Sequence, residues 1–116
     1  MMKKIYLSKR DADFLNEILS MTGDQIYDKH GYKRDETFTY TAKFPDGCYM
    51  DVKLVICEGE DTPYCEAVLF NPDGYEIAFT EPEYELLGEW TIKTEEKTYT
   101  VVLLEQGQDK EDSEAA

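Results

Sequence analysis

The sequence has few of the residues on which enzyme active sites most often depend. It contains a single histidine, His30, which lies between Lys29 and Gly31 in an expected surface turn. Nucleophilic catalysis needs a base within hydrogen-bond reach of the nucleophile, and a Cys–His pair stays open as an alternative. However, the cysteines are expected on strands rather than at a helix N-terminus, where a thiol becomes reactive. We therefore predict that the protein is not an enzyme and has no catalytic residues.

The cysteines are also too widely spaced for a typical zinc site. Cys48, Cys57 and Cys65 are nine and eight residues apart, and no Cys-x-x-Cys pair occurs. Structural zinc sites usually combine close pairs of Cys or His ligands. An odd number of cysteines, together with the lack of an apolar leader segment, favours reduced thiols in the cytoplasm. We expect structural thiols, no metal, no cofactor and a cytoplasmic location.

Long apolar runs and glycine-rich stretches are missing as well. No run approaches the roughly 18 apolar residues that span a bilayer, so no membrane partner is expected. The seven glycines are dispersed among turns and form no phosphate-binding loop. Acidic residues are so frequent that close carboxylate pairs are expected by chance, which gives a carboxylate-based enzyme little support. Among the functions considered, an enzyme that uses surface carboxylates is therefore ranked last.

Positive charge is scarce in most of the chain. Residues 1–34 carry a net charge of +2, whereas residues 35–116 carry five Lys/Arg, twenty-one Asp/Glu and a net charge of −16. The total of −14 exceeds the roughly 2–8 charges that keep a small domain soluble. Such a field repels nucleic acid and attracts basic proteins. We therefore expect a basic protein surface as the partner, and no direct binding of nucleic acid.

Two acidic segments and their neighbours are the candidate partner-binding surface. The residues are Glu58, Glu60, Asp61, Glu66, Glu76, Glu81, Glu83, Glu85 and Glu89. From Glu76 to Glu89, five acids occur with no basic residue between them. A simpler interpretation is that these acids lie on a solvated face and only maintain solubility.

In size, charge and lack of catalytic motifs, the sequence resembles small DNA-mimicking inhibitors such as anti-CRISPR and antirestriction proteins. The likeness is one of composition and involves no residue motif, so it transfers no functional positions. It implies an inhibitor of a nucleic-acid-binding host protein. The predicted function is a non-enzymatic protein-binding module with an acidic surface. The alternative is a small-ligand-binding domain with an aromatic pocket between helix and sheet, lined by Tyr40, Phe79, Trp90 and Tyr99.

The first predicted element is a helix over about residues 9–22. Ser8 and Asp11 resemble a capping box, and apolar residues recur between them and Gly23 at helical spacing. Gly23 is expected to end the helix. The spacing predicts that Phe14, Leu15, Ile18 and Leu19 face the core.

The sequence leaves the secondary structure of the segments on either side of this helix undecided. Ile5 and Leu7 form either a short strand or an apolar contact at the start of the helix. Residues 24–34 contain one more helical turn if Asp24 caps it and Gly31 ends it.

From Thr37 onwards, the apolar pattern has a period of two and predicts three β-hairpins. Their turns are residues 45–47, 71–74 and 94–97. The apolar facing pairs are Phe44/Cys48, Ala42/Met50, Tyr40/Val52 and Phe38/Leu54 in the first hairpin, Leu69/Ile77 and Ala67/Phe79 in the second, and Ile92/Tyr99 and Trp90/Val101 in the third.

These elements predict the α+β class. Residues 1–105 are expected to form a single domain, in which the N-terminal helix packs on one face of an antiparallel meander of about six strands. Residues 106–116 contain acids and two terminal alanines without other apolar residues, which is typical of a disordered acidic tail. The sheet side of the core is predicted to contain Phe38, Tyr40, Met50, Val52, Leu54, Leu69, Ile77, Phe79, Trp90 and Val101.

Overall fold

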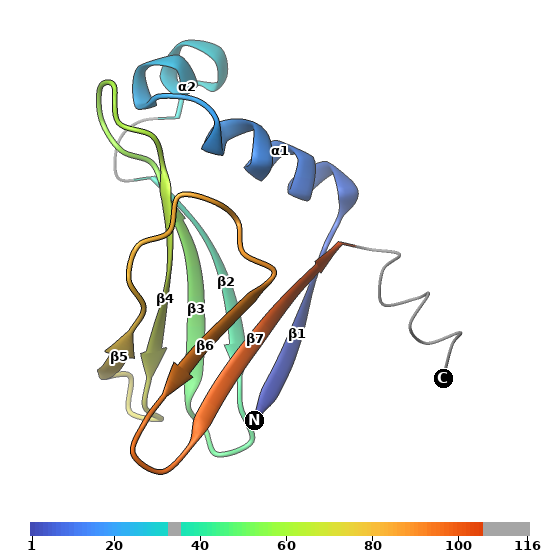
Figure 1. Ribbon diagram of the computed structural model, residues 1–116, viewed down its shortest axis with the longest axis vertical. Helices are drawn as coiled ribbons and strands as arrows, with labels where there is room; N and C mark the ends of the chain where they lie inside the picture. The colour runs from blue at the N-terminus through green and yellow to red at the C-terminus, as the bar shows by residue number, and fades with distance from the viewer. Residues whose placement is uncertain (33–35, 106–116) are drawn as a thin grey trace.

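The structure is a computed structural model that describes residues 1–32 and 36–105 as two helices and two β-sheets (Figure 1). The elements are β1 (Met2–Leu7), α1 (Lys9–Leu19), α2 (Gly23–His30), β2 (Thr37–Lys43), β3 (Tyr49–Val55), β4 (Tyr64–Phe70), β5 (Glu76–Phe79), β6 (Glu89–Lys93) and β7 (Thr98–Glu105). This confirms the α+β class. The acidic tail predicted for residues 106–116 lies outside the described residues.

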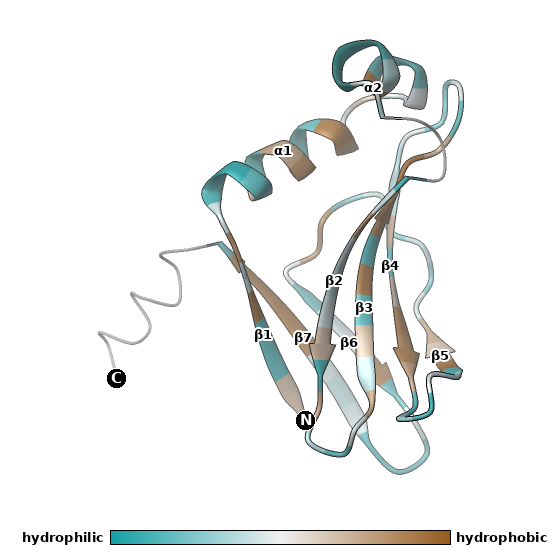
Figure 2. Cartoon of the chain, turned by 180° about the vertical axis from the view of Figure 1, so that it is seen from behind, coloured by the Kyte–Doolittle hydropathy of each residue, from teal (hydrophilic) through white to brown (hydrophobic). Residues whose placement is uncertain are grey.

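The strands form two layers rather than one meander. One sheet has the order β2-β3-β4-β5 and is antiparallel, and the other has the order β1-β7-β6. Strands β6 and β7 lie together on one face of the first sheet, in front of it in Figure 1 and behind it in the reversed view of Figure 2. Buried side chains of both sheets, such as Val52 and Val101, belong to one shared core. The prediction of a single six-stranded meander is therefore wrong.

The second sheet exists because β1 pairs with β7 in parallel, with Lys3 opposite Val101 and Ile5 opposite Leu103. Pairing between the two ends of a chain leaves no trace in a local hydrophobic pattern, which explains why the prediction missed it. The three-stranded sheet covers the apolar face that was assigned to the helix. Helix α1 instead lies across one end of the two sheets (Figure 1), where it buries Leu15 and Ile18.

The first and third hairpins have the predicted registers. Ala42 faces Met50 in the first, and Trp90 faces Val101 in the third. The second hairpin is shifted, because a bulge lies between Leu69 and Phe70. A bulge adds one residue to one strand and reverses the faces that follow.

As a result, Ile77 and Phe79 are not in the core. Phe79 faces Val68 instead of Ala67, and the side chains of Ile77 and Phe79 are 47% and 66% exposed. Asn71 stabilises the turn between β4 and β5: its Oδ1 accepts hydrogen bonds from the backbone N–H groups of Asp73 and Tyr75. The predicted pairs of this hairpin are therefore wrong.

The helix starts follow the predicted capping chemistry, but the boundary at Gly23 does not. Ser8 Oγ accepts from the Asp11 N–H at 3.0 Å and caps α1. Gly23 was expected to end α1, yet it begins α2, which is capped by a box formed by Thr22 and Gln25. The helical turn left open between residues 24 and 34 is thus real, with Thr22 rather than Asp24 as its cap.

None of the three cysteines forms a disulfide, and two of them are buried. Only Cys65 lies in a strand, since Cys48 is in the first hairpin turn and Cys57 follows β3. The prediction that all three lie on strands is therefore wrong. Burial raises the pKa of the Cys65 thiol to about 12, so this sulfur stays protonated and packs as a small apolar group.

Asp46 connects the first hairpin turn to the second sheet. Its Oδ2 accepts hydrogen bonds from Tyr99 Oη at 2.6 Å and Lys97 Nζ at 3.1 Å. Its Oδ1 accepts from the Cys48 N–H at 3.0 Å. The Tyr99 hydrogen bond is the main cause that lowers the pKa of Asp46 from 3.8 to about 2.

We expect the protein to lose stability in acid as the Asp46 carboxylate becomes protonated. Because the pKa of Asp46 is lower in the folded than in the unfolded chain, its contribution is full above 3.8 and is lost as the pH falls towards 2. In urea melts, the midpoint should decrease across that interval. Asp46→Asn should flatten the decrease, whereas an unchanged pH slope in this variant would contradict the assignment.

Candidate functional site

The structure brings the two acidic segments together along one edge of the four-stranded sheet. The Cys65 N–H donates to the Glu83 carbonyl at 2.6 Å, and the Glu83 N–H donates to the Cys65 carbonyl at 2.8 Å. This bridge places the segment after β5 beside the start of β4, next to the β3–β4 loop (Figure 1). We call this surface the acidic edge. Its acids are Glu58, Glu60, Asp61, Glu76, Glu81, Glu83 and Glu85.

Two of the predicted surface residues lie elsewhere. Glu66 is half-buried on β4, in the strand register directly opposite Lys53 of β3. Glu89 begins β6 and belongs to the second sheet. The acidic edge is therefore smaller than the predicted surface.

The acidic edge has no basic residue of its own. Between Lys53 and Lys93 the sequence contains ten Asp/Glu and no Lys, Arg or His. Three lysines form ion pairs with acids outside the edge: Lys9 with Asp13, Lys29 with Glu17 and Lys97 with Asp46. These three lysines are therefore engaged away from the acidic edge.

Exposed aromatic side chains accompany the acids, and the sequence patterns missed this feature. Tyr75 is 71% exposed, and Phe79 and Tyr84 are each 66% exposed. Tyr84 lies between Glu83 and Glu85 in the sequence. Phe79 was predicted to lie in the core, but the bulge in this hairpin turns its side chain to the opposite face of the sheet. Exposed apolar side chains rimmed by polar ones are typical of interaction surfaces.

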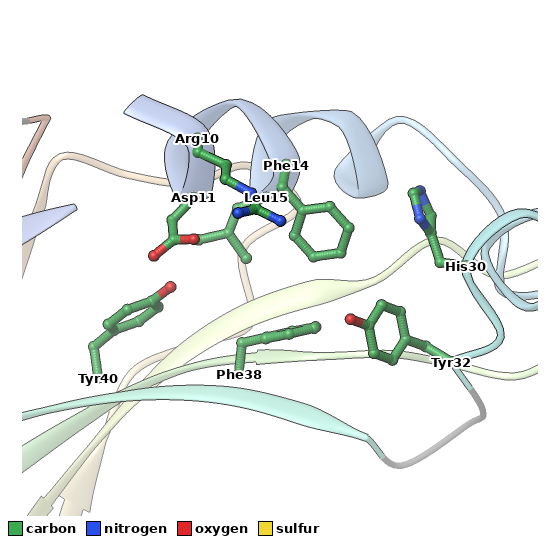
Figure 3. Close-up of a pocket in the computed structure, with 8 residues that line it drawn as sticks. All are labelled: Arg10, Asp11, Phe14, Leu15, His30, Tyr32, Phe38 and Tyr40. Atoms are coloured by element: carbon green, nitrogen blue, oxygen red, sulfur yellow. The ribbon is translucent and has the colours of Figure 1, made fainter. Parts of the chain in front are cut away.

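A second feature is a cleft of about 510 Å³ between α1, the end of α2 and β2. Figure 3 shows its lining side chains, which are Arg10, Asp11, Phe14, Leu15, His30, Tyr32, Phe38 and Tyr40. Its aromatic end is a set of edge-to-face contacts in which the ring centroid of Phe14 lies 5.1 Å from His30, 5.9 Å from Tyr32 and 5.6 Å from Phe38. The cleft volume lies in the range that is usual for small-molecule sites.

Only Tyr40 among the predicted pocket residues lines this cleft. Trp90 and Tyr99 are buried in the core between the sheets, and Phe79 lies at the acidic edge. The pocket expected between helix and sheet thus has a different lining, because the face assigned to it is covered by the second sheet. The aromatic residues of α1 and of the α2–β2 region were not recognised as a cluster.

Two pKa shifts occur at or near the cleft, one at Tyr40 in its lining and one at Glu17, which lies outside the lining but beside His30. A hydrogen bond from Lys29 is the main cause that lowers the pKa of Glu17, and His30 Nε2 lies 3.6 Å from Glu17 Oε1. Burial, with a smaller contribution from the nearby Asp11 carboxylate, raises the pKa of Tyr40. The cleft is therefore apolar with a few charged groups at its rim, which favours the binding of a small molecule.

The search for metal sites and membrane spans gives negative results for the described part of the chain. Residues 1–32 and 36–105 contain no group of three His, Cys, Asp or Glu side chains that is close enough to hold a metal ion. Neither described helix is long and apolar enough to cross a membrane.

No protein-family model, curated protein or solved structure matches the chain. Functional conclusions therefore rest on the residues and on their geometry.

Proposed function

We propose that this protein is a non-enzymatic protein-binding module that docks its acidic edge on a basic surface of a partner protein. The observation that carries the proposal is the backbone bridge between Cys65 and Glu83, which joins two acidic segments into one edge. A patch of one sign raises the rate at which an oppositely charged partner arrives, by about 10–10³-fold at low salt. The acids are therefore placed where they act together.

The exposed aromatics give the same edge a means of holding the partner. Interfaces typically combine aromatic anchors with a polar rim. Tyr75, Phe79 and Tyr84 lie on or beside the edge and present large exposed side chains. Carboxylates set the rate of arrival, and buried aromatic area slows dissociation.

The partner that best fits this chemistry is a nucleic-acid-binding protein. Such proteins carry Lys and Arg side chains that bind rows of phosphates. A row of carboxylates along a sheet edge offers those cations an alternative ligand. Occupying the same surface would exclude the nucleic acid, so inhibition is the most concrete form of the proposed function.

Charge reversal provides the test. In the edge variant, Glu81, Glu83 and Glu85 are replaced by Lys, and in the control variant Glu111, Asp112 and Glu114 are replaced by Lys, which changes the net charge equally. Proteins retained by the wild-type protein from nuclease-treated lysate are purified, and association rates are measured at several salt concentrations. We expect the edge variant to associate about ten-fold more slowly or worse and with weaker salt dependence.

The edge variant should fold, because Glu83 makes its bridge through backbone atoms and the segment lies outside the strands. A thermal melt checks this. Duplex DNA should compete with the wild-type protein for the partner. Equal slowing in both variants would mean that the charge acts only as a diffuse field, and the absence of any retained basic protein would refute acidic docking.

A further inference from the structure

We propose that the cleft beneath α1 binds a free aromatic α-amino acid. The aromatic ring packs against the cluster of Phe14, Tyr32 and Phe38, the carboxylate pairs with Arg10, and the ammonium group pairs with Asp11. This site is separate from the acidic edge, and its proposal does not depend on acidic docking.

The shape of the cleft provides an apolar end and a polar end (Figure 3). Phe14 descends from α1, while Phe38 rises from β2, and the Tyr32 hydroxyl points towards Phe38. The Tyr32 and Phe38 ring centroids are 5.4 Å apart in an edge-to-face arrangement. The aromatic ring of a ligand would meet the edges and faces of these side-chain rings. Edge-to-face contacts are among the arrangements that aromatic rings prefer.

The polar end is formed by charged groups that lack partners in the described part of the chain. Figure 3 shows the Arg10 guanidinium beside Leu15 at the rim of the cleft and the Asp11 carboxylate directed towards Tyr40. Neither the Arg10 nor the Asp11 side chain forms a hydrogen bond or ion pair with another described residue, and Asp11 acts on Tyr40 only through its charge. By contrast, Lys9 and Asp13, on the same helix but outside the cleft, pair with each other at 3.5 Å.

The charges select the type of ligand. Arg10 and Asp11 carry opposite charges close together, so an adjacent carboxylate and ammonium group satisfies both. Among the described residues that line the cleft, an anionic ligand such as a nucleotide would meet one arginine, and the protein's net charge of −14 opposes its approach. A zwitterion has no net charge and avoids this repulsion. A ring beside an α-carboxylate and α-ammonium is the structure of an aromatic amino acid.

The test is an NMR titration of the ¹⁵N-labelled protein with L-phenylalanine at millimolar concentration. We expect the backbone amide signals of Phe14, Phe38 and Tyr40 to shift and to saturate. Three related compounds each lack one group: L-phenylalaninamide lacks the carboxylate, N-acetyl-L-phenylalanine lacks the ammonium group, and L-alanine lacks the ring. Each should bind at least about ten-fold more weakly, because one charged group or the ring loses its partner.

Two variants assign the charged contacts. Arg10→Gln should abolish the preference for L-phenylalanine over its amide, and Asp11→Asn should abolish the preference over the N-acetyl compound. The matched control is the double variant Lys9→Gln/Asp13→Asn, which makes the same chemical changes outside the cleft and should bind like the wild-type protein. Both Arg10 and Asp11 are exposed, so folding should be retained.

Each contrary result would overturn the proposal. Saturation by L-alanine would show that the ring is not recognised. Tighter binding of the amide or of the N-acetyl compound would identify a peptide terminus as the occupant instead. Absence of shifts with L-phenylalanine, or identical affinity in Arg10→Gln and the wild-type protein, would show that the cleft does not bind this class of ligand.

Discussion

Ile18→Ala is expected to lower the free energy of unfolding by about 2–5 kcal/mol. The side chain of Ile18 is fully buried on the inner face of α1, next to Leu15. Removing its outer carbons loses the transfer free energy and leaves a cavity at the end of the two sheets. Leu15→Ala should have an effect of the same size, because Leu15 is buried in the same core.

Urea denaturation measures this effect, and Asn16 supplies the control. Asn16 is exposed on the same helix, so Asn16→Ala should change the free energy of unfolding by no more than about 0.5 kcal/mol. If Ile18→Ala and Leu15→Ala were as mild as Asn16→Ala, the helix would not seal the end of the core. The placement of α1 in Figure 1 would then be wrong.

The sequence predicts the parts of this fold in which two local signals agree. In the first hairpin, the turn at residues 45–47 and the alternation of apolar residues require the same register, and that register is observed. In the second hairpin, the bulge beside Phe70 adds a residue that alternation cannot reveal. The parallel pairing of β1 with β7 joins the two ends of the described chain and has no local signal at all.

The candidate sites likewise combine features that the sequence predicts with features that only the structure shows. Charge counts identify the acids, but only the bridge between Cys65 and Glu83 shows that two segments share an edge. Phe38 and Tyr40 were assigned to the core by their period of two, and they do point inward along β2. Both are only half-buried, because the cleft lies above them. Alternation gives the face of a side chain but not what covers that face.

The join between α2 and the acidic loop depends on a close backbone approach at Gly23. The Gly23 N–H donates to the Asp61 carbonyl at 2.8 Å, and the Asp24 N–H donates to the Gly59 carbonyl at 2.9 Å. A Cβ atom on Gly23 would lie 2.1 Å from the backbone oxygen of Cys57 and 2.9 Å from its carbonyl carbon. The obstacle is backbone, which cannot rotate away as a side chain would.

Gly23→Ala is therefore expected to destabilise the protein by about 1–5 kcal/mol. Alanine favours a helix over glycine by about 1 kcal/mol, which opposes the loss. Overpacking costs about 1–3 kcal/mol, and displacement of the loop also weakens two backbone hydrogen bonds worth about 0.5–1.5 kcal/mol each. The unfavourable contributions are larger, so the net effect is a loss of stability.

Gly88→Ala is the matched control, because no heavy atom beyond the two neighbouring residues lies within 4 Å of a Cβ atom at that glycine. Its free energy of unfolding should stay within about 0.5 kcal/mol of the wild-type value. Because the loop displaced by Gly23→Ala carries Glu58, Glu60 and Asp61, this variant should also slow association with a basic partner, whereas Gly88→Ala should not. Equal stability of the two alanine variants in urea melts would show that α2 and the acidic loop are not held together at Gly23.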